Sequence, residues 1–373
     1  MFRKNLFILF LFLIAMTGES QKRLRDYGIT PGVLPTGKWN SITDVAGVKV
    51  GNVTLIRGDS IRTGVTAILP CDGNIFQEKV PAAIFVGNGF GKLAGITQVN
   101  ELGNIETPII LTNTLNVGTA VTAVVKYTLQ QKGNENVQSV NAVVGETNDG
   151  YLNDIRGMHV TEKDVWDAIS KASSGKVAEG NAGAGTGTVC FGFKGGIGTS
   201  SRKLPESLGG YTVGVLVQTN FGGVLNINGI DAGKQLKKFS FSDQILKHAD
   251  GSCMVIVATD APLDYRNLHR LAKRAFMGIA NTGGIAANGS GDYIIAFSTA
   301  AGLRVPYNEK PELLSQDLLS NGQTSPLFLA AIEATSEAIW NSLVAAKTME
   351  GYKGHKVEAL QMDKIQFTND EKN

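Results

Sequence analysis

The chain has 373 residues, of which 43% are hydrophobic and 18% are charged, so it can bury a sizeable core in one large domain or in two ordinary ones. Lysine and arginine number 35 against 33 acidic residues, and a net charge of +2 argues against a nucleic-acid-binding protein. Glycine accounts for 45 residues, about 12% against a usual 7%, yet it follows no fixed period, which excludes collagen and low-complexity chains.

The N-terminus has the order of a secretory signal peptide. Arg3 and Lys4 precede an apolar run from Leu6 to Met16, and small and polar residues follow it. A membrane span needs roughly 20 apolar residues, so this run is short for one, although a retained anchor is the alternative. We predict that residues 1–20 are removed and that the mature protein is periplasmic or secreted, without stable membrane association.

Apolar alternation and short apolar runs closed by glycine, proline or polar residues predict strands over 48–55, 63–70, 82–87, 108–114, 141–150, 211–220, 252–259 and 292–298. Helical spacing and start signals predict helices over 116–131, 161–173, 264–280 and 326–349. We expect a kink near Gly51, a glycine-dense loop over 180–198 and a surface excursion over 232–250. Strands outnumber helices, which favours a single α+β domain with two sheets between helix layers.

Cysteine, histidine and glycine patterns predict neither a metal site nor a bound cofactor. Cys71, Cys190 and Cys253 lie far apart, and no metal-binding Cys/His spacing occurs. Cys190 and Cys253 stand in apolar runs, so we expect buried, inert thiols. The glycines of 87–91 lack the spacing of a phosphate loop, and those of 183–187 lack the dinucleotide pattern, so we predict close backbone packing instead.

Gly289-Ser290-Gly291 places a serine where a turn meets a strand. Asn288 stands where a nucleophile elbow would require glycine, so this is not that motif. A serine nucleophile needs a proton acceptor, which can be a carboxylate, a hydroxyl relay or its own α-amine once the preceding peptide bond is cut.

Asn288-Gly-Ser-Gly-Asp292, followed by Ile294–Thr299, resembles the self-cleavage site of the L-aminopeptidase/D-esterase family, which includes the β-peptidyl aminopeptidases. Segments similar to this family occur in the same order from about residue 25 to about residue 350: Gly145–Gly150, Gly195–Thr199, Val217–Gly222, Ala258–Pro262 and Glu333–Ala338. The resemblance implies an αββα four-layer sandwich like that of N-terminal-nucleophile hydrolases. It also implies a cut between Gly289 and Ser290, which would give an α chain, 21–289, and a β chain, 290–373, and an assembly of several such αβ units.

The resemblance also implies roles for single residues. Ser290 would cut the chain by an N-to-O acyl shift and then act as the nucleophile. Glu146 is our candidate for binding a substrate ammonium group, and Asn220 for donating to the oxyanion, a donor whose loss typically costs on the order of 3 kcal/mol. The family's Ser-x-Glu relay is matched by Thr335-Ser-Glu337, in which threonine replaces serine. A shift by one residue would offer Ser336 instead.

We therefore predict a self-processing serine aminopeptidase that acts on short peptides or on aminoacyl amides and esters. The enzymatic alternative is an acyltransferase similar to ornithine acetyltransferases, which have threonine at the cut site instead of Ser290. The alternative from another class is a peptide-binding module of the same fold without turnover.

Overall fold

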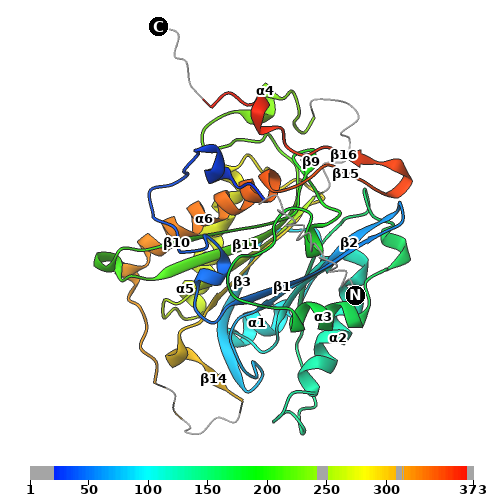
Figure 1. The fold of residues 1–373 in the computed structure, drawn as a ribbon. Helices are drawn as coiled ribbons and strands as arrows, with labels where there is room; N and C mark the ends of the chain where they lie inside the picture. The colour runs from blue at the N-terminus through cyan, green and yellow to red at the C-terminus, as the bar shows by residue number, and fades with distance from the viewer. Residues whose placement is uncertain (1–20, 242–250, 308–312, 314, 368–373) are drawn as a thin grey trace, which may run out of the picture.

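The computed structural model describes residues 21–241, 251–307, 313 and 315–367. Two β-sheets lie face to face, and each is covered on its outer side by helices (Figure 1). The predicted signal peptide, 1–20, lies outside the described residues. Within the described residues, no helix is both long and apolar enough to cross a membrane.

The five-stranded sheet has the order β1 (Lys49–Arg57), β2 (Ile61–Leu69), β6 (Ile109–Asn113), β7 (Val143–Thr147) and β4 (Leu93–Ala94). Strands β6 and β7 are parallel, and α2 (Val117–Leu129) connects them across the outer face. Helix α3 (Glu162–Ser170) packs beside α2 on the same face (Figure 1). Thr161 caps α3, because its hydroxyl accepts from the backbone N–H of Asp164.

The seven-stranded sheet has the path β10 (Ile197–Lys203), β11 (Thr212–Asn220), β12 (Ser252–Thr259), β13 (Gly291–Ser298), β3 (Glu78–Gly89) and β14 (Val305–Pro306), and β5 (Asn104–Ile105) pairs with β3. Strands β12 and β13 are parallel and are connected by α5 (Tyr265–Asn281), which Asp264 caps. Helix α6 (Ser325–Val344) packs beside α5 and over β10 and β11.

Three apolar clusters fill the spaces between these layers. The alternation of β13 shows how: Ile294 and Ala296 face α5 and α6, while Ile295 and Phe297 face the other sheet. A third cluster lies between the five-stranded sheet and the helices α2 and α3. This confirms the predicted α+β class and the αββα order of layers.

The shorter elements include α1 (Ile96–Leu102), α4 (Ala232–Gln235), the ribbon β8 (Val189–Cys190) with β9 (Phe193–Lys194), the ribbon β15 (Met349–Glu350) with β16 (Lys356–Val357), and several 3-10 turns. Cys190 and Cys253 are fully buried free thiols, as predicted. Their burial raises the pKa of both, that of Cys190 to about 12.

Some predicted details of the elements are wrong. No kink interrupts β1, whose pairing with β2 is regular through Gly51. A Cβ on Gly51 would stand 2.0 Å from the carbonyl oxygen of Ala168, so the glycine allows α3 to approach the strand. The predicted loop, 180–198, contains β8 and β9 and runs into the first two residues of β10, and the last helix ends at Val344 rather than at Met349. Ala232 is buried rather than on the surface, and residues 242–250 of the same predicted segment lie outside the described residues.

Candidate active site

Ser290 lies immediately before β13, a central strand of the seven-stranded sheet. It stands at the edge of the sheet that is formed by the ends of the strands. Strand pairing places Gly291 opposite Ser252 of β12, and Ser252 opposite Asn220 of β11. Neighbouring strands are about 4.8 Å apart, so Asn220 and Gly291 stand about 10 Å from each other along this edge.

A tight turn leads into the serine. The backbone N–H of Ser290 donates to the carbonyl oxygen of Ala287 at 2.8 Å, and neither Asn288 nor Gly289 has a positive φ, as in a type I turn. The side-chain amide of Asn88 in β3 donates to the same Ala287 oxygen at 2.7 Å. Asn288 is exposed, whereas Ser290 is only 1% exposed. The bond before Ser290 therefore connects an exposed turn to a buried strand.

Every polar group of Ser290 has a defined partner. Its carbonyl oxygen accepts from the backbone N–H of Phe90 at 3.2 Å, and its hydroxyl donates to Oδ1 of Asp292 at 2.9 Å. Burial raises the pKa of Asp292 to about 6, against the lowering effect of the hydrogen bonds from Ser290 and from the backbone of Cys253. The second oxygen of Asp292, Oδ2, is buried and has no hydrogen-bond partner among the described residues. At neutral pH this carboxylate can therefore accept the serine proton.

Glu146, at the end of β7, is a second buried carboxylate. It is 3% exposed, its Oε1 accepts from the backbone N–H of Lys92 at 3.1 Å, and its Oε2 accepts from the hydroxyl of Thr114. Burial raises its pKa, although these two hydrogen bonds and the charge of Lys92 lower it. None of the ion pairs among the described residues includes Glu146. A buried acid without a cationic partner is unusual and suits a cationic ligand.

Gly91 shows how close Glu146 is to the serine. A Cβ on Gly91 would stand 3.0 Å from Oε1 of Glu146 and 3.5 Å from Cα of Gly291, the residue after Ser290. The ring of Tyr293 lies beside the same point, and its pKa is raised by burial and by the negative charges of Glu146 and Asp292. The two carboxylates therefore flank one tyrosine at the edge where Ser290 lies.

Asn220 lies on this edge, but its side chain makes hydrogen bonds with two backbone groups. Its Oδ1 accepts from the N–H of Val189 at 2.9 Å, and its Nδ2 donates to the carbonyl oxygen of Asn148 at 3.0 Å. An amide nitrogen carries two protons, and the second N–H of Asn220 has no acceptor among the described residues.

Glu337 belongs to a buried ion-pair network. Its carboxylate accepts from Arg25 at 2.7 and 2.8 Å, pairs with Arg202 at 2.8 Å and accepts from Asn40 at 2.5 Å. Burial alone would raise the pKa of Glu337, but the hydrogen bond from Arg25, the positive charges of both arginines and the Asn40 bond lower it overall. Strand pairing aligns Arg202 of β10 with Ser298 of β13. Arg202 is therefore level with the end of β13 that is opposite to Ser290.

Thr335 and Ser336 lie between α5 and α6. Thr335 donates to the carbonyl oxygen of Ala331 at 2.7 Å, and Ser336 donates to that of Ile332 at 3.0 Å and accepts from Asn281 at 3.1 Å. Among the described residues, the hydroxyl of Ser290 makes no hydrogen bond with Thr335, Ser336 or Glu337, so the relay that the resemblance implies stays a prediction. The carboxylate that contacts the serine is that of Asp292.

Sequence reasoning placed Asp292 inside the self-cleavage motif but gave it no role. The signal was present, because residues i and i+2 of a strand share a face and an acid two positions after the serine can reach its hydroxyl. Asn88, Thr114 and Tyr293 were also missed, because their proximity depends on the pairing of strands far apart in the chain.

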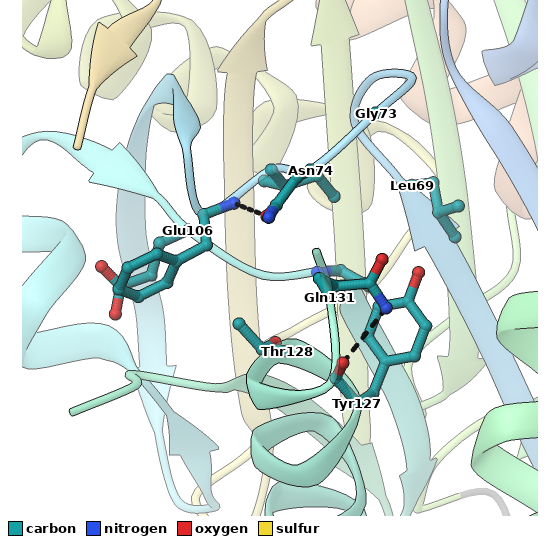
Figure 2. A pocket seen from close by; sticks show the side chains of 10 residues that line it. Leu69, Gly73, Asn74, Glu106, Tyr127, Thr128 and Gln131 are labelled. Carbon is teal, nitrogen blue, oxygen red and sulfur yellow. Dashed lines mark hydrogen bonds between the residues drawn. The ribbon is translucent and has the colours of Figure 1, made fainter. Parts of the chain in front are cut away.

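A small pocket lies away from this edge. It is lined by Leu69 at the end of β2, by Glu106, by the last turn of α2 and by Gln131 just after it, whose side chain donates to the carbonyl oxygen of Tyr127 (Figure 2). Glu146 stands at the opposite end of the five-stranded sheet, so this pocket is separate from the site. Among the described residues, no cluster of His, Cys, Asp and Glu has the arrangement of a metal site.

Comparison with known proteins gives a consistent result. Residues 40–357 match the model of peptidase family S58. The chain is 41% identical over 360 residues to a β-peptidyl aminopeptidase of Sphingosinicella microcystinivorans, covering 91% of this chain and 89% of that protein.

The chain is also similar to solved structures. A protein of Pyrococcus horikoshii has a TM-score of 0.85 and 48% identity, covering 92% of this chain and 97% of that one. The L-aminopeptidase/D-Ala-esterase/amidase of Ochrobactrum anthropi, described as a variant of the N-terminal-nucleophile-hydrolase fold, has a TM-score of 0.84 and 36% identity, covering 92% and 96%. These likenesses confirm the predicted fold type.

Proposed function

Because this chain belongs to peptidase family S58, we propose that it is a self-processing serine aminopeptidase that removes N-terminal residues from short peptides, amides or esters. The observation that carries the proposal is the hydrogen bond from Ser290 Oγ to the buried carboxylate of Asp292, directly after an exposed Asn-Gly turn.

The first reaction cuts the chain before Ser290. Asp292, whose pKa is about 6, accepts the hydroxyl proton while Oγ attacks the carbonyl carbon of Gly289. The bond from that carbon to the Ser290 nitrogen breaks, and the proton passes to the nitrogen, which leaves an ester on Oγ. Water then hydrolyses the ester to a Gly289 carboxylate and a Ser290 with a free hydroxyl and a free amine.

The second reaction uses the freed Ser290 on a substrate. Its hydroxyl attacks the substrate carbonyl, the leaving amine or alcohol takes the proton, and water releases the acyl group. The base is the new α-amine of Ser290 or the carboxylate of Asp292. Asn220, on the same sheet edge, donates its remaining amide N–H to the oxyanion.

Glu146 supplies the selectivity for a free amino end. Glu146 is buried and belongs to none of the ion pairs of the described residues, so it gains a charge-assisted hydrogen bond when a substrate ammonium group reaches it. An internal peptide bond carries no such charge, so substrates without a free amine lack this interaction. The name of the Sphingosinicella relative makes β-peptides one substrate class to test.

Two further parts of the proposal rest on the sequence and on the resemblance. Residues 1–20 direct export to the periplasm or the medium, and several αβ units assemble into a homo-oligomer. The proposed chemistry uses only groups of the chain and water, so it requires no metal or cofactor.

The mass spectrum of the purified protein tests the proposal. We expect a fragment that begins at Ser290, hydrolysis of β-alanyl or L-alanyl p-nitroanilide, and a single uncut, inactive chain for Ser290→Ala. A full-length chain that hydrolyses these anilides would overturn the self-cleavage mechanism but not the aminopeptidase activity. An uncut chain that retains a peptide without turnover would support the binding-module alternative.

A further inference from the structure

We propose that Gly91 determines the selectivity for free amines, because the absence of a side chain at this position keeps Oε1 of Glu146 open toward Ser290. This inference rests on the proposed function and deepens it, since it assigns the ammonium subsite to the space between Gly91, Glu146 and Tyr293.

The connection between β3 and β4 joins the two halves of the site. Within it, the backbone N–H of Phe90 donates to the carbonyl oxygen of Ser290 at 3.2 Å, and the N–H of Lys92 donates to Oε1 of Glu146 at 3.1 Å. The two contacts are made by residues that flank Gly91 on either side. The backbone of this loop therefore fixes the spacing between the nucleophile and the carboxylate.

Gly91 lies between the two residues that make these contacts. A Cβ there would be 3.0 Å from Oε1 of Glu146, 3.3 Å from Cε2 of Tyr293 and 3.5 Å from Cα of Gly291. The first two distances are tighter than ordinary packing contacts, so a methyl group would cover the oxygen or displace the carboxylate.

Backbone conformation does not explain the glycine. Gly91 has no positive φ, so it is not held in the left-handed conformation that favours glycine. What the structure shows at this position is the close approach of Glu146 and Tyr293, which leaves little room for a Cβ. A carboxylate oxygen that accepts one backbone N–H can accept a further hydrogen bond, so Oε1 can also take an ammonium proton.

The end of β3 provides a matched control. Gly89 also has no positive φ, and among the described residues a Cβ on it would meet Val86 alone, at 3.6 Å, which is an ordinary contact. Gly89→Ala thus makes the same chemical change two residues away without approaching Glu146.

The test compares Gly91→Ala with Gly89→Ala in the full-length protein. Self-cleavage is followed by mass spectrometry, and kcat and KM are measured for β-alanyl p-nitroanilide and for propionyl p-nitroanilide, which lacks only the amine. For Gly91→Ala we expect normal self-cleavage, a KM for the amine-bearing substrate raised about tenfold or more, and turnover of the propionyl substrate changed less than about twofold. Gly89→Ala should change none of these quantities.

A double-mutant cycle shows whether the effect acts through the carboxylate. Glu146→Gln should raise the same KM, and adding Gly91→Ala to it should cost less than about a further twofold. The inference is overturned if Gly91→Ala leaves KM unchanged, if it lowers turnover of both substrates equally, or if it prevents self-cleavage. A wild-type protein that hydrolyses both substrates equally well overturns the proposed role of Glu146 itself, and the inference with it.

Discussion

At the scale of single residues, two buried acids at one sheet edge have different surroundings and therefore suit different tasks. Glu146 is held by a backbone N–H and a hydroxyl, and it has no cationic partner among the described ion pairs. Asp292 accepts from Ser290 and keeps one oxygen without a hydrogen bond among the described residues. Such a pair separates ligand binding from proton transfer.

Asp292→Asn should slow self-cleavage by about 10²-fold or more, because the amide cannot accept the proton of Ser290. Burial raises the pKa of the wild-type carboxyl to about 6, so the wild-type rate should rise as the pH passes through about 6 and then level off. The measurement is the decay of full-length chain on denaturing gels after refolding at a series of pH values.

Glu106→Gln is the control for Asp292→Asn, since Glu106 is another buried acid and lies beside the separate pocket of Figure 2. It should cut at the wild-type rate. An Asp292→Asn chain that cuts at the wild-type rate with the same pH profile would show that another group takes the proton.

The resemblance to the family pointed to Ser290, Asn220 and Glu146, which the structure brings to one edge of the sandwich. The residue pattern added only that each of them lies close to the end of a strand-like run. The hydrogen bond to Asp292 depends on rotamers and on burial, which one sequence does not show. Glu337 had the right residue type, yet Arg25 and Arg202 engage its carboxylate.

At the scale of elements, the contact of α5 with α6 depends on Gly278. A Cβ on Gly278 would stand 2.6 Å from Cβ of Thr335 and 3.0 Å from the carbonyl oxygen of Ile332, so the glycine allows the two helices to approach closely. Thr335 thus fills a space between helices, which is a packing role.

Thr335→Val tests this packing role against the relay role. Valine keeps the shape and loses the hydroxyl, whose one hydrogen bond among the described residues is to the backbone of its own helix, so self-cleavage and hydrolysis should stay within about twofold of wild type. Ser336→Ala should behave in the same way. A rate of self-cleavage or hydrolysis lowered by about 10²-fold in either variant would show that its hydroxyl takes part in the proton relay.

Glu337→Gln should destabilise the protein by about 3–5 kcal/mol, because it leaves the fully buried Arg202 with one charged partner fewer. The pKa of Glu337 is lowered in the folded state, so its stabilising effect is present above the ordinary glutamate pKa and is lost as the pH falls through the folded value. Urea unfolding of uncut Ser290→Ala protein at several pH values measures both effects.

Asp167→Asn, which removes the exposed pair with Lys163, is the control for Glu337→Gln and should change stability little. Equal effects of the two variants would contradict a structural role for the network. A hydrolytic defect of Glu337→Gln with unchanged stability would instead return Glu337 to the active site.

Long apolar strands and capped helices could be predicted from sequence, because burial on both faces leaves continuous apolar runs such as β12. Strand β10 was missed because it follows a glycine-dense segment and carries polar residues such as Arg202, whose burial depends on partners from α6. Gly51 was predicted to kink its strand, because the sequence does not reveal that α3 packs against this residue.

At the scale of the whole molecule, the proposed cut separates elements that share one sheet. Strand β13 is hydrogen-bonded between β12 and β3, so the fragment 290–373 would supply a central strand to a sheet built mostly by the fragment 21–289. Helix α6 adds a large part of the outer core, including Ile339, Trp340 and Leu343. Near its start, the described chain is fixed to this same helix by the hydrogen bond from Leu24 to Asn341.

The two fragments should therefore co-elute in gel filtration and separate only in denaturant. The check is a column run in buffer and another in urea, with denaturing gels of each fraction. Fragments that separate in buffer would contradict the observed sheet order.

Because β13 is inserted between strands of the other fragment, the proposed cut changes the molecularity of refolding. The intact precursor folds as one chain, at a rate independent of dilution. The cut enzyme, once melted, must find its partner fragment by diffusion, so its recovery should fall as concentration falls. Native enzyme in dilute surroundings would then persist through a slow rate of unfolding rather than through repeated renaturation.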